Sequence, residues 1–228
     1  MSNSTANPTV SFVVPASNEA DLLPATLSAI DAAAASVAHE TLVVDGDSDD
    51  ATRTVARDHG ARVIRARPTG QGDARHRGAR HASGRWLAFV DADTRVRPDY
   101  LEAMLAFVRE RDLAGANSRC RVTGGWRTVP FELLFNHGLP RLSPPPFPGF
   151  NVFVSRPAYF DVGGFASGPN EDLTFSRRLG RSYPTATCPR VLVETSGRRM
   201  TEDGLLRTVG HYTGLEYRRL CRLAESRN

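Results

Sequence analysis

The most constraining feature of this sequence is a regular alternation, in its first hundred residues, between short apolar runs and amphipathic stretches. The apolar runs occupy residues 10–14, 41–45, 61–66 and 86–91. Each is short and apolar on both faces, which is typical of parallel strands covered by helices. The stretches between them carry apolar residues at helical spacing. This order predicts an α/β protein with a doubly wound, mostly parallel sheet and helices on both faces.

Capping signals place the first two helices. Asn18 can cap the first helix, with Pro24 in its first turn, and Asp49 and Asp50 can open the second. The second half is less regular, and there we expect strands at 116–122, 151–155 and 191–195, helices at 127–137 and 168–179, and a stiff proline-rich connector at 143–150.

Composition excludes several kinds of protein. The chain has 228 residues, a net charge of +4 and no lysine, which rules out a P-loop and a Schiff-base enzyme. No apolar run approaches the roughly 20 residues of a membrane span. The first eight residues lack a basic and an apolar region, so no secretory signal is expected. Three widely spaced cysteines argue against a disulfide framework and a zinc site. We therefore expect a cytoplasmic protein.

Carboxylates collect where the predicted strands end. The three acidic clusters are residues 45–50, the pair Asp91 and Asp93, and the pair Glu171 and Asp172. In open α/β sheets, ligands bind beyond the carboxyl ends of the strands. Two carboxylates held as close as Asp91 and Asp93 call for a neutralising cation. Mg²⁺ or Mn²⁺ fits, because such ions bind one or two carboxylates together with a diphosphate and water.

Arginines face the same predicted edge. Residues 62–85 contain seven arginines and one acid, and within them Gly70 and Gly72 precede Arg75 at a helix start. Such a start favours an anion, so phosphate contact is expected for Arg75. Arg198 and Arg199 follow the last predicted strand and could also bind phosphate. The alternative for any one of these arginines is a solvated basic surface.

The motifs in order resemble family 2 glycosyltransferases with the GT-A fold. They are PASNE (15–19), VVDGDSDD (43–50), GQGDARHRGA (70–79), FVDADT (89–94), GGF (163–165) and NEDLTFSRRL (170–179). The resemblance covers roughly residues 9–200, and the SGRR segment (196–199) before a basic tail resembles a small soluble bacterial and archaeal subgroup.

That resemblance implies an inverting, metal-dependent transfer from a nucleotide-diphosphate sugar to an acceptor hydroxyl or phosphate. It assigns Asp172, paired with Glu171, as the general base, and Asp93 with Asp91 as ligands of Mn²⁺ or Mg²⁺. The remaining donor-binding residues that it implies are Pro15, Ala16, Glu19, Asp45, Arg75, Ala92, Arg198 and Arg199.

With this resemblance, the sequence can be divided into three predicted segments. We expect a disordered segment at 1–8, a GT-A domain at 9–203 and a basic amphipathic helix at 204–228. Within the domain, residues 9–97 form the nucleotide-binding half and 98–203 the acceptor half. The expected partners are a UDP- or GDP-linked donor and a carbohydrate or lipid-linked acceptor, and no nucleic acid. Residues 126–150 either contact the acceptor or pack in the core. The tail either lies on the anionic inner face of the cell membrane or packs on the domain.

Two other classes compete with this interpretation. The run DADT (91–94) also fits the nucleophile motif of haloacid-dehalogenase-type phosphatases, with Asp91 as covalent nucleophile, but that leaves the preceding ninety residues unexplained. A pI of 9.3 and the arginine cluster would also suit a non-catalytic module that binds anions or nucleic acid, although no aromatic residues alternate with these arginines.

Overall fold

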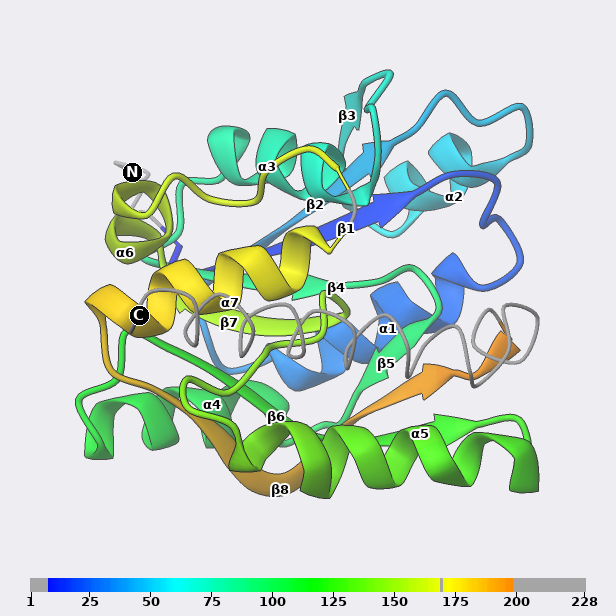
Figure 1. Cartoon of the computed structure of the whole chain (residues 1–228). Coiled ribbons are helices and arrows are strands. Elements are labelled where there is room, and N and C mark those ends of the chain that lie inside the picture. Colours follow the sequence, from blue (N-terminus) through cyan, green and yellow to red (C-terminus); the bar gives the residue numbers. More distant parts are fainter. Residues whose placement is uncertain (1–7, 169, 199–228) are drawn as a thin grey trace.

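Eight strands form one curled sheet in the order β3-β2-β1-β4-β7-β6-β8-β5 (Figure 1). The computed structural model describes residues 8–168 and 170–198; Arg199 and the predicted tail at 204–228 lie outside them. The strands are β1 (Val10–Ala16), β2 (His39–Asp45), β3 (Arg62–Arg65), β4 (Trp86–Val90), β5 (Thr94–Val96), β6 (Gly115–Thr123), β7 (Asn151–Ser155) and β8 (Thr185–Ser196).

The first four strands of the sheet order are parallel, as the alternating pattern predicts. Val14 of β1 is paired with Val43 of β2, and Val13 with Phe89 of β4, and all four side chains are fully buried. The helices that follow these strands are α1 (Leu23–Ala33), α2 (Thr52–Asp58), α3 (Gln71–His81) and α4 (Tyr100–Glu110). Since parallel strands need crossover connections, these helices cover both faces of the sheet.

The strand direction in the sheet reverses at β7. This strand is antiparallel to both β4 and β6, while β8 is parallel to β6 and antiparallel to β5. The predicted strand at 191–195 is the second half of the longer β8, and β5 was not predicted. The helices of this half are α5 (Val129–Leu133), α6 (Arg156–Asp161), which was also not predicted, and α7 (Glu171–Ser182).

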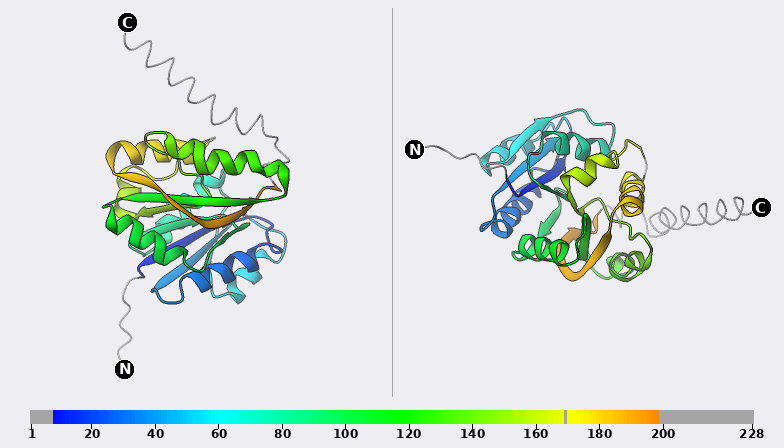
Figure 2. Two further views of the ribbon diagram at one scale, coloured as in Figure 1. Left: turned by 90° about the horizontal axis from the view of Figure 1, so that it is seen from below. Right: turned by 90° about the vertical axis from the view of Figure 1, so that its left-hand side faces the viewer.

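Two apolar layers hold the helices against the sheet. On one face, α1 and α4 pack on Phe12 and Val14 of β1. On the other face, α3, α6 and α7 pack on Val13 and Phe89. Figures 1 and 2 show the sheet between these two helical layers. Adjacent residues of β1 thus enter opposite layers, which explains why its whole run is apolar.

The helix starts differ in detail from the sequence prediction. Asn18 does not cap α1, which begins after Leu22; Asn18 instead has a left-handed backbone, and its side-chain oxygen accepts a hydrogen bond from the Asp49 amide at 2.9 Å. Asp50 does serve the start of α2, because its carboxylate accepts from the Thr52 amide at 2.9 Å. Within the described residues, no helix is long and apolar enough to cross a bilayer.

Candidate active site

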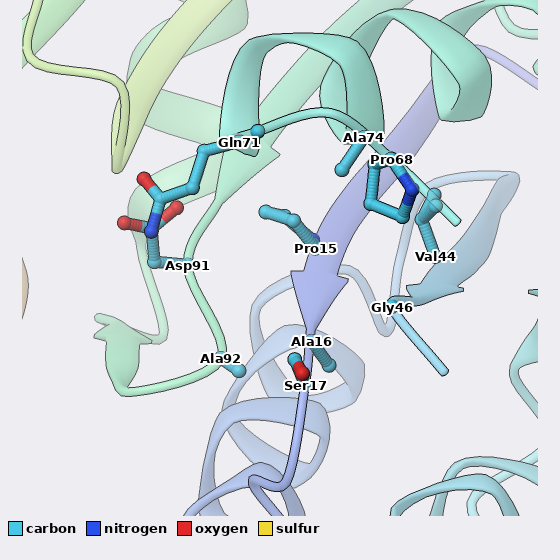
Figure 3. Close-up of a pocket in the computed structure, with 11 residues that line it drawn as sticks. Pro15, Ala16, Ser17, Val44, Gly46, Pro68, Gln71, Ala74, Asp91 and Ala92 are labelled. Atoms are coloured by element: carbon cyan, nitrogen blue, oxygen red, sulfur yellow. The ribbon is translucent and has the colours of Figure 1, made fainter. Parts of the chain in front are cut away.

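A cavity of about 260 Å³ opens where β1, β2 and β4 end, beside the start of α3. It is lined by Pro15, Ala16, Ser17, Val44, Gly46, Pro68, Gly70, Gln71, Ala74, Asp91 and Ala92. Four of these were predicted to bind the donor: Pro15, Ala16, Asp91 and Ala92. In Figure 3, the side chain of Gln71 reaches from α3 toward Asp91 on one side of the opening. The structure thus places a pocket at the sheet edge that the strand pattern marks as ligand-binding.

Asp45 ends β2 next to this pocket, but its carboxylate is engaged by the protein. The side chain is 1% exposed and accepts hydrogen bonds from the Arg53 guanidinium at 2.9 Å and from the Ser48 amide at 3.3 Å. Its neighbours Val44 and Gly46 line the pocket. Asp45 therefore orders the wall of the pocket, and its predicted hydrogen bond to a base stays a prediction.

Arg75 of α3 joins two of the predicted acidic clusters. Its guanidinium, 2% exposed, donates to Asp91 at 2.7 Å, to Glu171 at 3.1 Å and to Gln71 at 3.2 Å, and lies 5.6 Å from the centre of the Phe165 ring. Burial by itself lowers the pKa of this guanidinium, but the Asp91 and Glu171 carboxylates outweigh it and raise that pKa. A buried planar cation therefore fixes the pocket lined by Asp91 relative to the start of α7.

Two glycines leave room for this arrangement. A Cβ on Gly149 would lie 2.7 Å from three atoms of the Arg75 guanidinium, and a Cβ on Gly72 would lie 2.5 Å from the Glu171 side chain. The Gly149 amide also donates to Asp172 at 3.3 Å. The connector at 143–150 and the start of α7 thus meet α3 at distances that only glycine permits.

Replacing Gly149 with Ala is expected to push the Arg75 guanidinium off its carboxylates and to lower kcat about tenfold, with overpacking that destabilises the fold by about 1–3 kcal/mol. Steady-state transfer rates and thermal unfolding check this. The matched control is Gly60→Ala, strained by a φ of 72° but with no atom within 4 Å of the new Cβ. That control should lose stability and keep kcat; an unchanged kcat in Gly149→Ala would contradict the proposed spacing.

Asp172 lies in the first turn of α7, after Asn170, whose φ of 61° turns the chain into the helix. Its two carboxylate oxygens accept from the Leu173 amide at 2.7 Å and the Gly149 amide at 3.3 Å. Two backbone amides therefore orient the Asp172 carboxylate, one residue from the Arg75 partner Glu171. Its predicted role as general base stays a prediction.

Glu19 and Arg198 come together from opposite ends of the fold. Glu19, 5% exposed, is 3.5 Å from the half-exposed Arg198 guanidinium. The Glu19 backbone carbonyl also accepts from the Leu23 amide at 2.9 Å and so begins α1. The segment after β8 thus approaches the loop after β1, as the predicted site requires of Arg198.

Asp93 lines a second, polar cavity of about 240 Å³ with Leu22, Thr26, Arg95, Thr123, Glu194, Thr195 and Ser196. Its carbonyl accepts from the Ser196 amide at 3.3 Å, which fixes the loop between β4 and β5 to the end of β8. Asp91 and Asp93 therefore border two adjoining hollows, and Ala92 between them lines the first.

The carboxylates of Asp91 and Asp93 suit a hard divalent cation. Among residues 8–168 and 170–198, no three His, Cys, Asp or Glu side chains form a metal-binding group. A magnesium or manganese ion needs only one or two carboxylates when a diphosphate and water supply the rest. Arg75 contacts one of the two Asp91 oxygens. The residues present therefore fit a divalent ion whose remaining ligands come from a diphosphate and water.

Two residues of this site were missed in the sequence. Gln71 contacts Arg75 four positions later on the same helix, and that spacing could have revealed it. Gly149 is close to Arg75 only because the chain folds back, so no local signal marks it.

Solved structures show the same fold. S. aureus TarS in complex with UDP-GlcNAc superposes with a TM-score of 0.68 at 17% identity, over 82% of this chain and 58% of that one. The Pyrobaculum calidifontis mannosyltransferase PcManGT, in complex with GDP-Man and Mn²⁺, gives a TM-score of 0.66 at 22% identity, over 83% and 57%. The chain therefore has the GT-A fold.

Sequence comparison gives the family. An uncharacterized glycosyltransferase of Mycobacterium tuberculosis is 33% identical over 144 residues, covering 59% of this chain and 64% of the relative, just under two thirds of its length. The family model for glycosyl transferase family 2 matches residues 11–174, which is well over half of the chain. This chain therefore belongs to glycosyl transferase family 2.

Proposed function

We propose that the protein transfers a sugar, with inversion, from a UDP- or GDP-linked donor to a hydroxyl or phosphate of a carbohydrate or lipid-linked acceptor. The observation that carries this proposal is the shared contact of Arg75 with Asp91 and Glu171. It holds the pocket of about 260 Å³ and the oriented carboxylate of Asp172 in one unit, as direct transfer between two bound substrates requires.

In this proposal the donor lies along the sheet edge. Its contacts are assigned to Pro15, Ala16, Glu19, Asp45, Arg75, Asp91 and Ala92, and those of the diphosphate to Arg198 and to Arg199, which lies outside the described residues. Asp91 and Asp93 hold Mn²⁺ or Mg²⁺. When bound, the ion neutralises the charge that develops on the departing diphosphate.

Asp172 serves as the general base. It removes the proton of the acceptor hydroxyl as that oxygen bonds to the anomeric carbon, while the bond to the diphosphate breaks on the opposite face. Glu171 positions this base through Arg75.

The two donors considered are those of the structural neighbours. TarS was solved with UDP-GlcNAc and PcManGT with GDP-Man and Mn²⁺. The phosphatase alternative is not favoured, because the family match begins at residue 11 and so accounts for the chain before Asp91.

Calorimetric titration of the full chain with UDP and GDP, each with and without Mn²⁺, tests the proposal. We expect heat from one nucleotide, increased by the ion. Absence of heat with both nucleotides would count against donor binding. Phosphate release from a generic phosphomonoester would favour the phosphatase, and salt-sensitive oligonucleotide binding that persists in Asp93→Ala would favour the binding module.

Replacing Asp93 with Ala is expected to weaken Mn²⁺-dependent nucleotide binding about 10–100-fold, because one ligand of the ion is lost. Titration of the nucleotide at several Mn²⁺ concentrations measures the effect. Glu194→Gln, in the same cavity, is the matched control and should keep the metal dependence. Equal metal dependence in Asp93→Ala and the wild type would contradict the assignment.

A further inference from the structure

A ridge of exposed apolar side chains follows β6. Its members are Trp126 (82% exposed), Leu133 (56%), Val129 (52%) and Leu142 (38%), which we call the apolar ridge. Trp126, Val129 and Leu133 are spaced by three and four residues, so they lie on one side of the helical stretch that contains α5. This stretch runs along the lower edge of the molecule in Figure 1.

The opposite side of the same stretch is fixed to the domain. Phe131, Phe135 and Leu139 are at most 5% exposed and belong to the core beneath the sheet. The Thr128 hydroxyl, on a buried side chain, donates to the Val122 carbonyl at 3.0 Å. The apolar ridge is therefore presented by an anchored scaffold.

Positive charge accompanies the ridge along the chain. Residues 119–142 contain four arginines and one acid, Glu132, and the side chains of Arg121, Arg127 and Arg141 are exposed. Glu132 is half-buried, and its carboxylate accepts from the Val122 amide at 2.9 Å. The stretch that carries Trp126 thus offers exposed apolar groups and cations, and its own carboxylate is bonded to the β6 backbone.

We propose that the apolar ridge is a membrane-contact surface that docks on an anionic bilayer. Tryptophan and leucine enter the head-group boundary while arginines pair with anionic lipid heads, and this combination is typical of interfacial helices. A second copy of the chain is disfavoured as the partner of this ridge, because it would bring the same arginines face to face. Residues 204–228 carry five arginines against two glutamates, so their charge also disfavours them as the cover of this ridge.

The proposed membrane contact goes beyond the proposed function and does not rest on it, because it is argued from the exposure of the apolar side chains and the charge of the arginines. It has a consequence for the candidate site. The chain leads from Leu142 into the connector at 143–150, where Gly149 contacts both the Arg75 guanidinium and Asp172. Docking through the ridge would therefore bring the acceptor half of the site toward the bilayer.

Tryptophan fluorescence of the full chain provides the first test. The chain has two tryptophans, and Trp86 is stacked on Phe153 with ring centres 5.1 Å apart. Phosphatidylcholine vesicles containing about one third phosphatidylglycerol should shift the emission to shorter wavelength, and pure phosphatidylcholine should not. The shift should vanish in Trp126→Phe. A shift that persists in Trp126→Phe, or no shift at all, would overturn the proposal.

Vesicle flotation gives the second test. Trp126→Ser/Leu133→Ser should lower the bound fraction about tenfold or more. The control Val191→Ser replaces an apolar side chain that is 38% exposed on β8 and should leave binding unchanged. Unchanged flotation of the double variant would assign binding to another segment and overturn the proposal. So would light scattering in lipid-free buffer that shows a dimer dissociated by the double variant.

Discussion

Asp172→Asn is expected to reduce kcat about 10³-fold or more while leaving nucleotide affinity within a factor of about two, because an amide cannot accept the acceptor proton. Asparagine keeps the size of the side chain and one oxygen for the Leu173 amide, so the start of α7 should stay folded. The measurements are initial rates at saturating donor and acceptor, and calorimetric titration of the nucleotide with Mn²⁺.

Glu171→Gln is the informative comparison for that variant. Glutamine can still accept a hydrogen bond from Arg75, but it gives up the charge of the ion pair, so an intermediate loss of kcat is expected. If Asp172→Asn kept more than about a tenth of the wild-type rate, Asp172 would not be the base, since positioned bases contribute about 10²–10⁴-fold. Loss of nucleotide binding in Asp172→Asn would instead point to a structural role.

Arg75→Lys is expected to lower kcat about 100-fold, because a lysine ammonium cannot hold Asp91 and Glu171 with the fixed fork of a guanidinium. The donor KM should change less than kcat if Arg75 acts through Asp91 and Glu171. Breaking a buried ion pair costs about 3–5 kcal/mol, and the variant keeps a positive charge to limit that loss. Initial rates over a range of donor concentrations, together with chemical denaturation, separate these effects.

The control for that variant lies on the same helix. Arg77 is half-exposed and pairs with Asp73 at 3.1 Å, so Arg77→Lys keeps a surface ion pair and should change neither kcat nor stability measurably. If Arg75→Lys raised the donor KM and spared kcat, the donor contact proposed for Arg75 would stand, and its role in positioning Glu171 would be excluded. Equal behaviour of the two variants would remove Arg75 from the site.

The sequence predicts the parallel half of the fold well because local and tertiary signals coincide there. Val13 and Val14 belong to a strand buried on both faces, and the helices between such strands carry their own apolar faces. The prediction of Asn18 as a cap was wrong because tertiary contact decides its role. Its side chain links the loop after β1 to the loop after β2.

Local pattern was a poorer guide to the second half. The short strand β5 pairs only with β8, and its three residues give no periodic signal. The predicted helix at 127–137 is observed as a 3₁₀ turn, α5, a π turn and a further 3₁₀ turn through Arg141. Asn136 interrupts that stretch by exchanging two hydrogen bonds with the Cys120 backbone of β6, a contact that residue spacing cannot reveal.

For the site, the sequence identified most of the side chains but not their joint geometry. Asp91 and Glu171 lie eighty positions apart, and only the fold shows that one guanidinium contacts both. The spacing of Gly149 from that guanidinium is equally a property of the folded chain.

The reversal of strand direction at β7 has a practical consequence for redesign. Val90 ends β4 opposite Asn151, the first residue of β7, so the segment entering β7 arrives at the edge where the pocket lined by Asp91 and Ala92 lies. Its other end is anchored on β6 by Thr128. The exposed positions between these two points, such as Val129 and Leu133, can therefore be varied while the buried Phe131 and Leu139 hold the stretch on the core, so these are the positions at which we propose to test acceptor choice.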